Sequence, residues 1–226
     1  MTARVDIAQR IAAGVAGYFQ YVNASHLLAM PGEDTAQFVM CQILQAQQRY
    51  RLSVSAKPPN WKGKMRVDAA LLPKAGAAAG WYGVAEVKWI TSSHQRDTVR
   101  GTLLQDCARV ASVDTTNLNA KFLVVGFIDG MLAKVFDNSH DPGPAEKQRS
   151  LLQAMLSRTT STAAASKAHT DILACFPDYQ SRVPACAQFT TGLEIELLAR
   201  STITQAGVDA GCVLVWQSNK RRGRPA

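Results

Sequence analysis

The stretch KMRVDAALLPKAGAAAGWYGVAEVKWI, residues 64–90, decides the fold that we expect for this chain. In its first part, apolar residues alternate with Lys64, Arg66 and Asp68, which is the period of a strand with one buried face. Its last part, YGVAEVKWI, is almost wholly apolar and rich in β-branched and aromatic residues, which predicts a central strand covered on both faces. The Gly/Ala-rich link between the two parts can return the chain antiparallel and set Asp68 beside Glu86.

Two charged residues interrupt the second predicted strand. Glu86 and Lys88 are two residues apart, so their side chains share one face and lie about 6–7 Å apart. Burying either charge without a partner would be costly, so a partner is expected. Two carboxylates and a lysine suit a hard divalent cation such as Mg²⁺, which prefers oxygen ligands. Asp68, Glu86 and the backbone carbonyl of Val87 could supply these oxygens, and Lys88 could position or help to deprotonate an attacking water.

The pattern of Asp68 followed by Glu86-Val87-Lys88 on neighbouring predicted strands resembles the PD-(D/E)xK superfamily, the restriction-endonuclease-like nucleases. Val67 stands before Asp68, where the family pattern has proline. The resemblance implies a Mg²⁺-dependent nuclease, for which Mn²⁺ can substitute. It also implies that Asp68, Glu86 and Lys88 are catalytic.

Many members of this family place a further glutamate on the helix that precedes the sheet, where it joins the catalytic metal site, often through water. Glu33 is the matching residue here, and Asp34 is the second choice. The alternative for Glu33 is a simple preference for acids in the first turn of a helix, where the helix dipole favours them.

Periodicity read without these residues predicts the same arrangement of elements. Apolar residues recur at helical spacing in three segments and at strand spacing, or in continuous apolar runs, in four others. In chain order from the second helix, this predicts helix, three strands, helix, strand. The expected fold is therefore α/β, a restriction-endonuclease-like αβββαβ core with a mixed central sheet flanked by helices, plus a C-terminal elaboration. The predicted helices are 4–22, 33–48 and 94–112, and the predicted core strands are 50–56, 64–72, 82–90 and 121–128.

Length and composition favour one soluble domain. The chain has 226 residues, of which 47% are hydrophobic, and it can bury a sizeable core. We expect a nuclease-like domain over 1–217, with its core at about 33–136 and an elaboration at about 137–217, followed by a basic disordered tail over 218–226. Five scattered cysteines favour reduced, buried thiols over disulfides or zinc. No run of 18 apolar residues and no signal-peptide layout is present, so a cytoplasmic location without a membrane partner is expected.

The formal net charge of +8 predicts a polyanionic partner, and DNA is our first choice. Basic residues precede Asp68 without an intervening acid, although a solvated loop would explain them equally well. Arg96 and Arg100, four residues apart on the third predicted helix, could hold phosphates. The sequence Arg222-Gly223-Arg224-Pro225 resembles the minor-groove-binding core of an AT-hook. The proposed nucleic-acid-binding residues are Lys62, Lys64, Arg66, Arg96, Arg100, Arg222 and Arg224.

Three functions remain open at this point. The first is a Mg²⁺-dependent DNA nuclease, most simply an endonuclease of restriction, phage defence or a mobile element. The second is a non-catalytic DNA-binding or assembly protein on the same scaffold. The third is an unrelated α/β protein in which Glu86 and Lys88 form a structural ion pair. A homodimer is compatible with each of them.

Overall fold

The structure is a computed structural model that describes residues 3–25, 32–47, 50–59, 61, 66–74, 80–114, 118–136, 193–205 and 207–220. From the N-terminal helix to the fourth strand its elements follow the order that periodicity predicts, and a short helix and two long strands come after them. In chain order they are α1 (Ala3–Ala24), α2 (Glu33–Ala46), β1 (Tyr50–Ala56), β2 (Val67–Pro73), β3 (Gly83–Ile90), α3 (Arg96–Ser112), β4 (Ala120–Ile128), α4 (Met131–Phe136), β5 (Leu193–Gln205) and β6 (Val208–Lys220).

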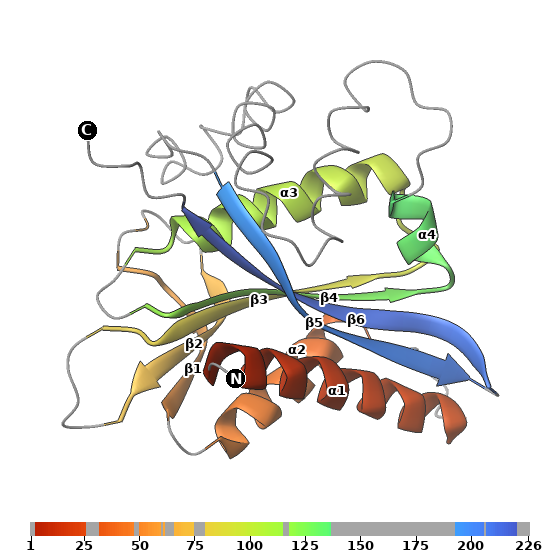
Figure 1. Cartoon of the computed structure of the whole chain (residues 1–226), viewed down its shortest axis with the longest axis horizontal. Helices are drawn as coiled ribbons and strands as arrows, with labels where there is room; N and C mark the ends of the chain where they lie inside the picture. Colours follow the sequence, from red (N-terminus) through yellow and green to blue (C-terminus); the bar gives the residue numbers. More distant parts are fainter. Residues whose placement is uncertain are drawn as a thin grey trace.

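The strands form one six-stranded sheet in the order β1-β2-β3-β4-β6-β5 (Figure 1). All neighbouring pairs are antiparallel except β3 and β4, which run parallel. A parallel pair needs a crossover connection, and α3 supplies it. The segment from α2 to β4 therefore has the helix, three strands, helix, strand order that we expected, within a mixed α/β architecture.

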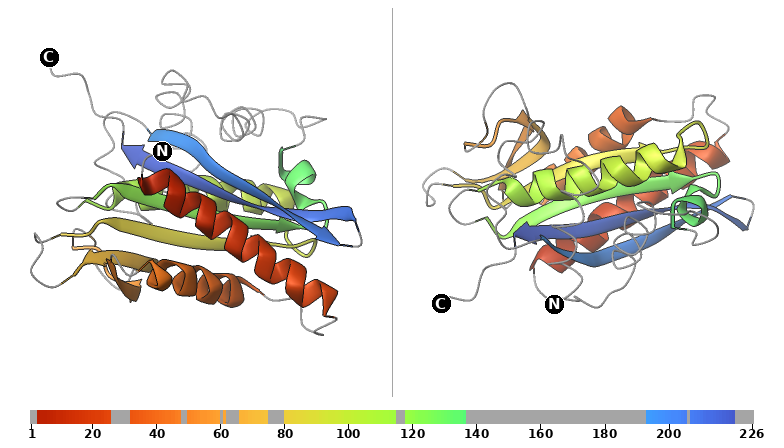
Figure 2. Two further views of the ribbon diagram at one scale, coloured as in Figure 1. Left: turned by 60° about the horizontal axis from the view of Figure 1, so that its bottom comes forward. Right: turned by 90° about the horizontal axis from the view of Figure 1, so that it is seen from above.

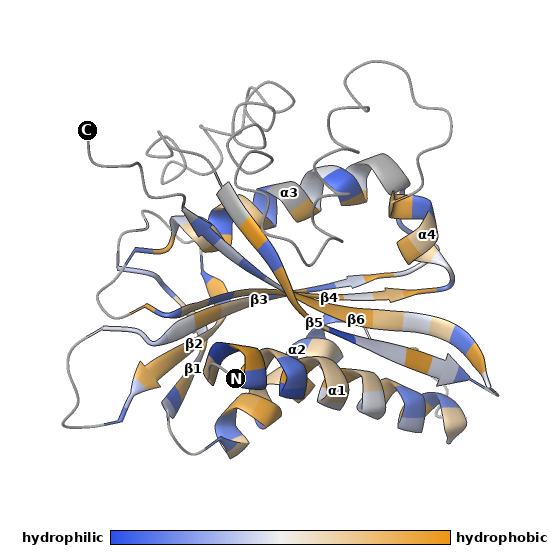
Figure 3. Ribbon diagram, in the orientation of Figure 1, coloured by the Kyte–Doolittle hydropathy of each residue, from blue (hydrophilic) through white to orange (hydrophobic). Residues whose placement is uncertain are grey.

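Helices cover both faces of the sheet (Figures 1 and 2). Helices α1 and α2 pack on one face, and α3 and α4 pack on the other. Figure 3 shows why the layers hold: the central strands are mostly apolar, whereas α1 and α3 alternate polar and apolar residues, as expected for helices with one buried side. The apolar residues that recur at helical spacing in α3 are all buried: Val99, Leu103, Cys107 and Val110.

Strand β3 lies in the interior of the sheet and is buried on both faces, as its apolar sequence predicts. Its Trp89 stacks on Phe19 of α1, with ring centroids 3.7 Å apart. Gly126 of β4 makes room for this indole, because a Cβ at that position would lie 1.9 Å from the Trp89 ring. These contacts pack α1 closely against β3 and β4 next to the charged residues of β3.

The C-terminal strands belong to the same sheet as the expected core. Strand β6 pairs with β4 along seven residue pairs, from Phe122–Gln217 to Ile128–Gly211. The expected tail boundary at residue 218 is wrong, because β6 continues to Lys220. Residues 137–192, the larger part of the expected elaboration, lie outside the described residues. Cys41, Cys107 and Cys212 are buried free thiols, as predicted.

None of the helices in the described part of the chain is both long enough and apolar enough to cross a bilayer.

Candidate active site

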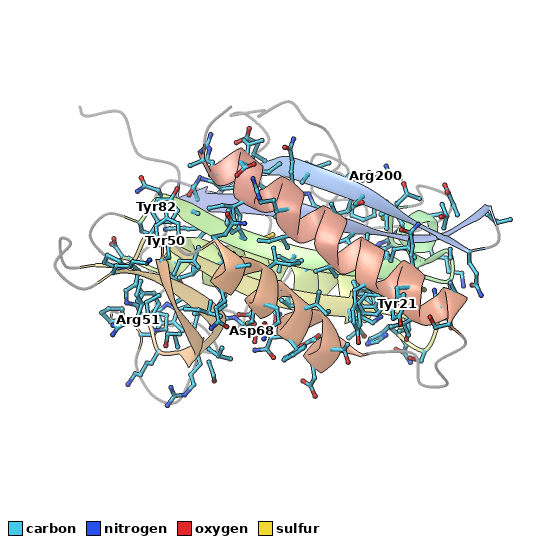
Figure 4. All side chains as sticks on the ribbon, turned by 90° about the horizontal axis from the view of Figure 1, so that it is seen from below. Tyr21, Tyr50, Arg51, Asp68, Tyr82 and Arg200 are labelled. Carbon is cyan, nitrogen blue, oxygen red and sulfur yellow. The ribbon has the colours of Figure 1, made fainter. Side chains whose placement is uncertain are left out.

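Asp68 fills a gap between β2 and β3. In the described residues, the pairing of these strands runs from Leu71–Gly83 to Ala69–Ala85 and stops there. Beyond this point the Val87 backbone N–H has no partner among the described main-chain atoms of β2. It donates a hydrogen bond of 2.7 Å to Oδ2 of the Asp68 side chain instead. The Gln37 side-chain amide of α2 donates to the Asp68 backbone carbonyl at 3.4 Å, and Figure 4 shows Asp68 beside α2. The N–H and C=O of one strand residue point the same way, so the Val87 carbonyl also faces this gap.

Lys88 joins the two helical layers. Its Nζ lies 3.0 Å from Oε1 of Glu33, at the start of α2, and 3.9 Å from Oδ2 of Asp106, in α3. The Lys88 side chain is 22% exposed. Burial lowers the pKa of its ammonium, but the carboxylates of Asp106 and Glu33 outweigh burial, and the net pKa is raised. Lys88 therefore stays protonated at neutral pH.

Glu86 lies on the same face of β3 as Lys88 and is only 4% exposed. Its Oε1 forms an ion pair with Nη2 of Arg109 in α3. The same guanidinium nitrogen lies 3.2 Å from Oδ1 of Asp106, so Arg109 sits between the two buried carboxylates. Oε2 of Glu86 and Oδ2 of Asp106 are buried, and among the described residues neither accepts a hydrogen bond.

The site raises the pKa of two of its acids. Burial raises the pKa of Asp106 to about 7, and the charges of Glu33 and Asp68 add to this, while Lys88 opposes it. Burial also raises the pKa of Asp68, against the hydrogen bond from Val87 and the charge of Lys88. These mutual effects mean that the carboxylates of Asp68, Asp106 and Glu33 are close enough to repel one another.

The charges of this cluster do not balance. When all are ionised, four carboxylates (Glu33, Asp68, Glu86 and Asp106) face two cations (Lys88 and Arg109), which leaves two negative charges. Burial raises the pKa of Asp68 and of Asp106, and a raised carboxyl pKa favours the neutral acid, which reduces this excess charge. One divalent cation would compensate the same charge.

The residues present fit a hard divalent cation in their chemistry. Carboxylate oxygens are the ligands that Mg²⁺ prefers, and two buried oxygens here lack hydrogen-bond donors. As the side chains stand, no three acidic, histidine or cysteine side chains in the described ranges converge closely enough to hold a metal ion. The Arg109 guanidinium lies between the oxygens of Glu86 and Asp106.

Sequence reasoning missed Asp106 and Arg109. The Arg109 side chain is only 24% exposed and contacts Glu86. The signal was present, because Asp106 lies three residues after Leu103 and four before Val110, on the apolar stripe of α3. An acid on such a stripe predicts a buried partner.

Of the residues predicted to contact DNA, one is buried, one is exposed, and the side chains of the others lie outside the described residues. The prediction that Arg100 contacts phosphate is wrong, because this residue is fully buried where α3 packs against α4. Its Nε donates a hydrogen bond of 2.7 Å to the Val135 backbone carbonyl of α4. It cannot contact a phosphate at the surface. Arg66 is exposed and donates to the Ser55 carbonyl. The side chain of Arg96 and residues Lys62, Lys64, Arg222 and Arg224 lie outside the described residues.

Comparison with known proteins identifies no relative. No family model, curated protein or solved structure matches this chain. Function must therefore be argued from the site itself.

Proposed function

We propose that this protein is a Mg²⁺-dependent DNA nuclease of the PD-(D/E)xK type, on a restriction-endonuclease-like core. One observation carries the proposal: four carboxylates, from α2, β2, β3 and α3, share one protonated lysine and one arginine, which leaves two negative charges in excess when all of these groups are ionised. Purely structural ion clusters tend toward charge balance, because unpaired buried charge is destabilising. A site that recruits a divalent cation needs the excess that is present here.

Each residue has a distinct role in this proposal. Asp68, Glu86 and the Val87 carbonyl would hold the cation, with Asp106 as an additional acid. When bound, Mg²⁺ supplies charge stabilisation at phosphorus and lowers the pKa of water. Lys88 keeps its proton, so we assign it the orientation of the attacking water and stabilisation of the phosphate charge rather than general-base catalysis. Glu33 holds the Lys88 ammonium at 3.0 Å and thereby positions it.

DNA is the proposed substrate because the chain as a whole is cationic while the site is anionic. The formal net charge of +8 attracts a polyanion, and a bound divalent cation would let a phosphate approach the carboxylates.

A second candidate function is a DNA-binding or assembly protein without catalysis. Arg109 favours it, because its guanidinium already neutralises Glu86 and Asp106 and could serve in place of a metal. In that case the cluster would specify packing between β3 and α3.

Cleavage of supercoiled plasmid DNA with Mg²⁺, and with EDTA, tests the proposal. Asp68→Asn and Glu86→Gln keep the shape of each side chain and should lower the cleavage rate by at least about 100-fold. Asp6→Asn is the matched control, because Asp6 is an acid on the surface of α1 that pairs only locally with Arg10. Its rate should equal that of the wild type. Cleavage that survives in EDTA or in both site variants would reject the proposed chemistry.

A further inference from the structure

A cavity of about 240 Å³ lies directly beside Lys88, between the end of β3 and the first half of α3. Lys88 and Glu33 are among the residues that line it, so the cavity adjoins the charged cluster. Its volume is below the range of about 300–1,000 Å³ that is usual for pockets of drug-sized ligands. The space therefore suits one small group rather than a long segment of a polymer.

The walls of the cavity differ sharply from the charged cluster. Ile90, Val99 and Leu103 are at least 95% buried and form an apolar floor. Such a floor does not accept a phosphate, because burying a charge without a partner is costly. The ligand part inside must be neutral and largely apolar.

Two neutral residues that can form hydrogen bonds, Gln95 and Thr102, also line the cavity. Gln95 caps α3 through its backbone, and its side-chain amide makes no capping hydrogen bond, so the amide is not committed to the helix. The Thr102 hydroxyl donates to the Thr98 carbonyl at 2.9 Å and can still accept a hydrogen bond. Gln95 and Thr102 line the cavity together with the apolar side chains, and this mixture of hydrogen-bonding and apolar groups matches a heterocycle with polar edges.

We propose that this cavity binds one unpaired nucleotide, with its base in the apolar part and its phosphate at Lys88. This inference rests on the proposed function and defines the substrate more narrowly. A base within a duplex cannot enter such a pocket, so the preferred substrate is single-stranded DNA or a duplex opened at the cleavage position.

Binding without hydrolysis tests the inference. The probe is a short single-stranded oligodeoxynucleotide with one 2-aminopurine and hydrolysis-resistant phosphorothioate linkages, titrated with the full chain and Mg²⁺. Its emission should rise as the fluorescent base leaves its stacked neighbours. Thr102→Phe places a ring in the cavity and should weaken binding about tenfold and remove the rise in emission.

Gln105→Phe is the matched control. It adds the same ring to α3 at a residue that does not line the cavity, and it should leave both the affinity and the emission unchanged. Circular dichroism and the urea midpoint would verify that both variants are folded. An emission response in Thr102→Phe equal to that of the wild type would overturn the inference.

The two proposals fail in different ways. If plasmid is not cleaved but the emission response is lost in Thr102→Phe alone, the cavity still binds a nucleotide and the hydrolytic function is rejected. If plasmid is cleaved and no variant alters the emission, the nuclease stands and the nucleotide cavity is rejected. Faster cleavage of a duplex with an unpaired base than of a fully paired one would support both.

Discussion

Glu86 and Asp106 are acids with only 4% of their surface exposed, and Arg109 is the cation that pairs with both. Removing a partner from a buried ion pair usually destabilises a protein more than the pair stabilises it, because a charge is left uncompensated. The arrangement therefore makes stability and cation binding depend on the same few atoms.

Arg109→Gln should lower the free energy of unfolding by about 3 kcal/mol in the absence of divalent cations, because it leaves two buried carboxylates without their guanidinium. Mg²⁺ should restore more of this loss in the variant than it adds to the wild type, since the position between the carboxylates is then open. Urea unfolding with and without Mg²⁺ measures both quantities. An equal effect of Mg²⁺ on the two proteins would show that Arg109 does not compete with the cation.

Asp106 should make stability depend on pH. Its pKa is raised from 3.8 to about 7 in the folded protein, so between about pH 4 and pH 7 the folded state holds a proton that the unfolded chain has released. The free energy of unfolding must then fall as the pH rises through this window, by up to about 1.4 kcal/mol per pH unit. In Asp106→Asn this contribution is removed and the profile should be flatter. Urea unfolding from pH 5 to 7 in EDTA measures it, and identical slopes in the two proteins would contradict the burial of an ionisable group here.

At the level of elements, the contact between β3, β4 and α1 depends on a glycine, Gly126, whose lack of a side chain leaves space for Trp89. Trp89 occupies the space above Gly126, and it is held there by Phe19. Trp89 directly follows Lys88 in sequence, so its packing anchors the backbone from which the Lys88 side chain extends.

Gly126→Ala should lower the free energy of unfolding by about 1–3 kcal/mol, because the new methyl group would overlap the Trp89 ring. Gly17→Ala is the opposite case. No atom lies within 4 Å of the added Cβ and the residue is within α1, so we expect a gain of about 0.5–1 kcal/mol. Thermal unfolding of both variants, followed by circular dichroism, provides the comparison. A neutral Gly126→Ala would mean that the indole can move aside.

At the scale of the whole molecule, β5 and β6 are part of the central sheet and not a separate addition to it. Strand β4 is buried along nearly its whole length, and β6 covers the edge that would otherwise be open. An exposed apolar edge strand is a template for aggregation.

A chain that ends at Phe136 should therefore not yield a folded monomer, although it contains the whole αβββαβ segment. Size-exclusion chromatography of this truncated chain should show aggregates, and its far-ultraviolet spectrum should lack the native shape. A monodisperse, cooperatively unfolding product would instead show that the segment from α1 to α4 is an independent domain.

Local patterns predicted most of the elements, because alternation and helical spacing report which side of each element is buried. They placed Asp68, Glu86 and Lys88 on β2 and β3 and Glu33 at the start of α2. They failed where burial depends on elements distant in sequence. Arg100 was predicted to hold phosphate together with Arg96, four residues away on one helix face, but it is buried and a carbonyl of α4 accepts its hydrogen bond. Asp106 and Arg109 face Glu86 only because α3 crosses over β3, which periodicity does not reveal.

The hydrogen bond from the Val87 N–H to the Asp68 carboxylate has a practical consequence for spectroscopy. A main-chain proton held by a carboxylate oxygen changes its magnetic environment whenever that oxygen gains a proton or turns toward a cation. The Val87 amide resonance in a ¹⁵N-labelled sample is thus an intrinsic probe of the charge on Asp68. Following that single cross-peak during titration with acid or Mg²⁺ would report occupancy of the site without any substrate.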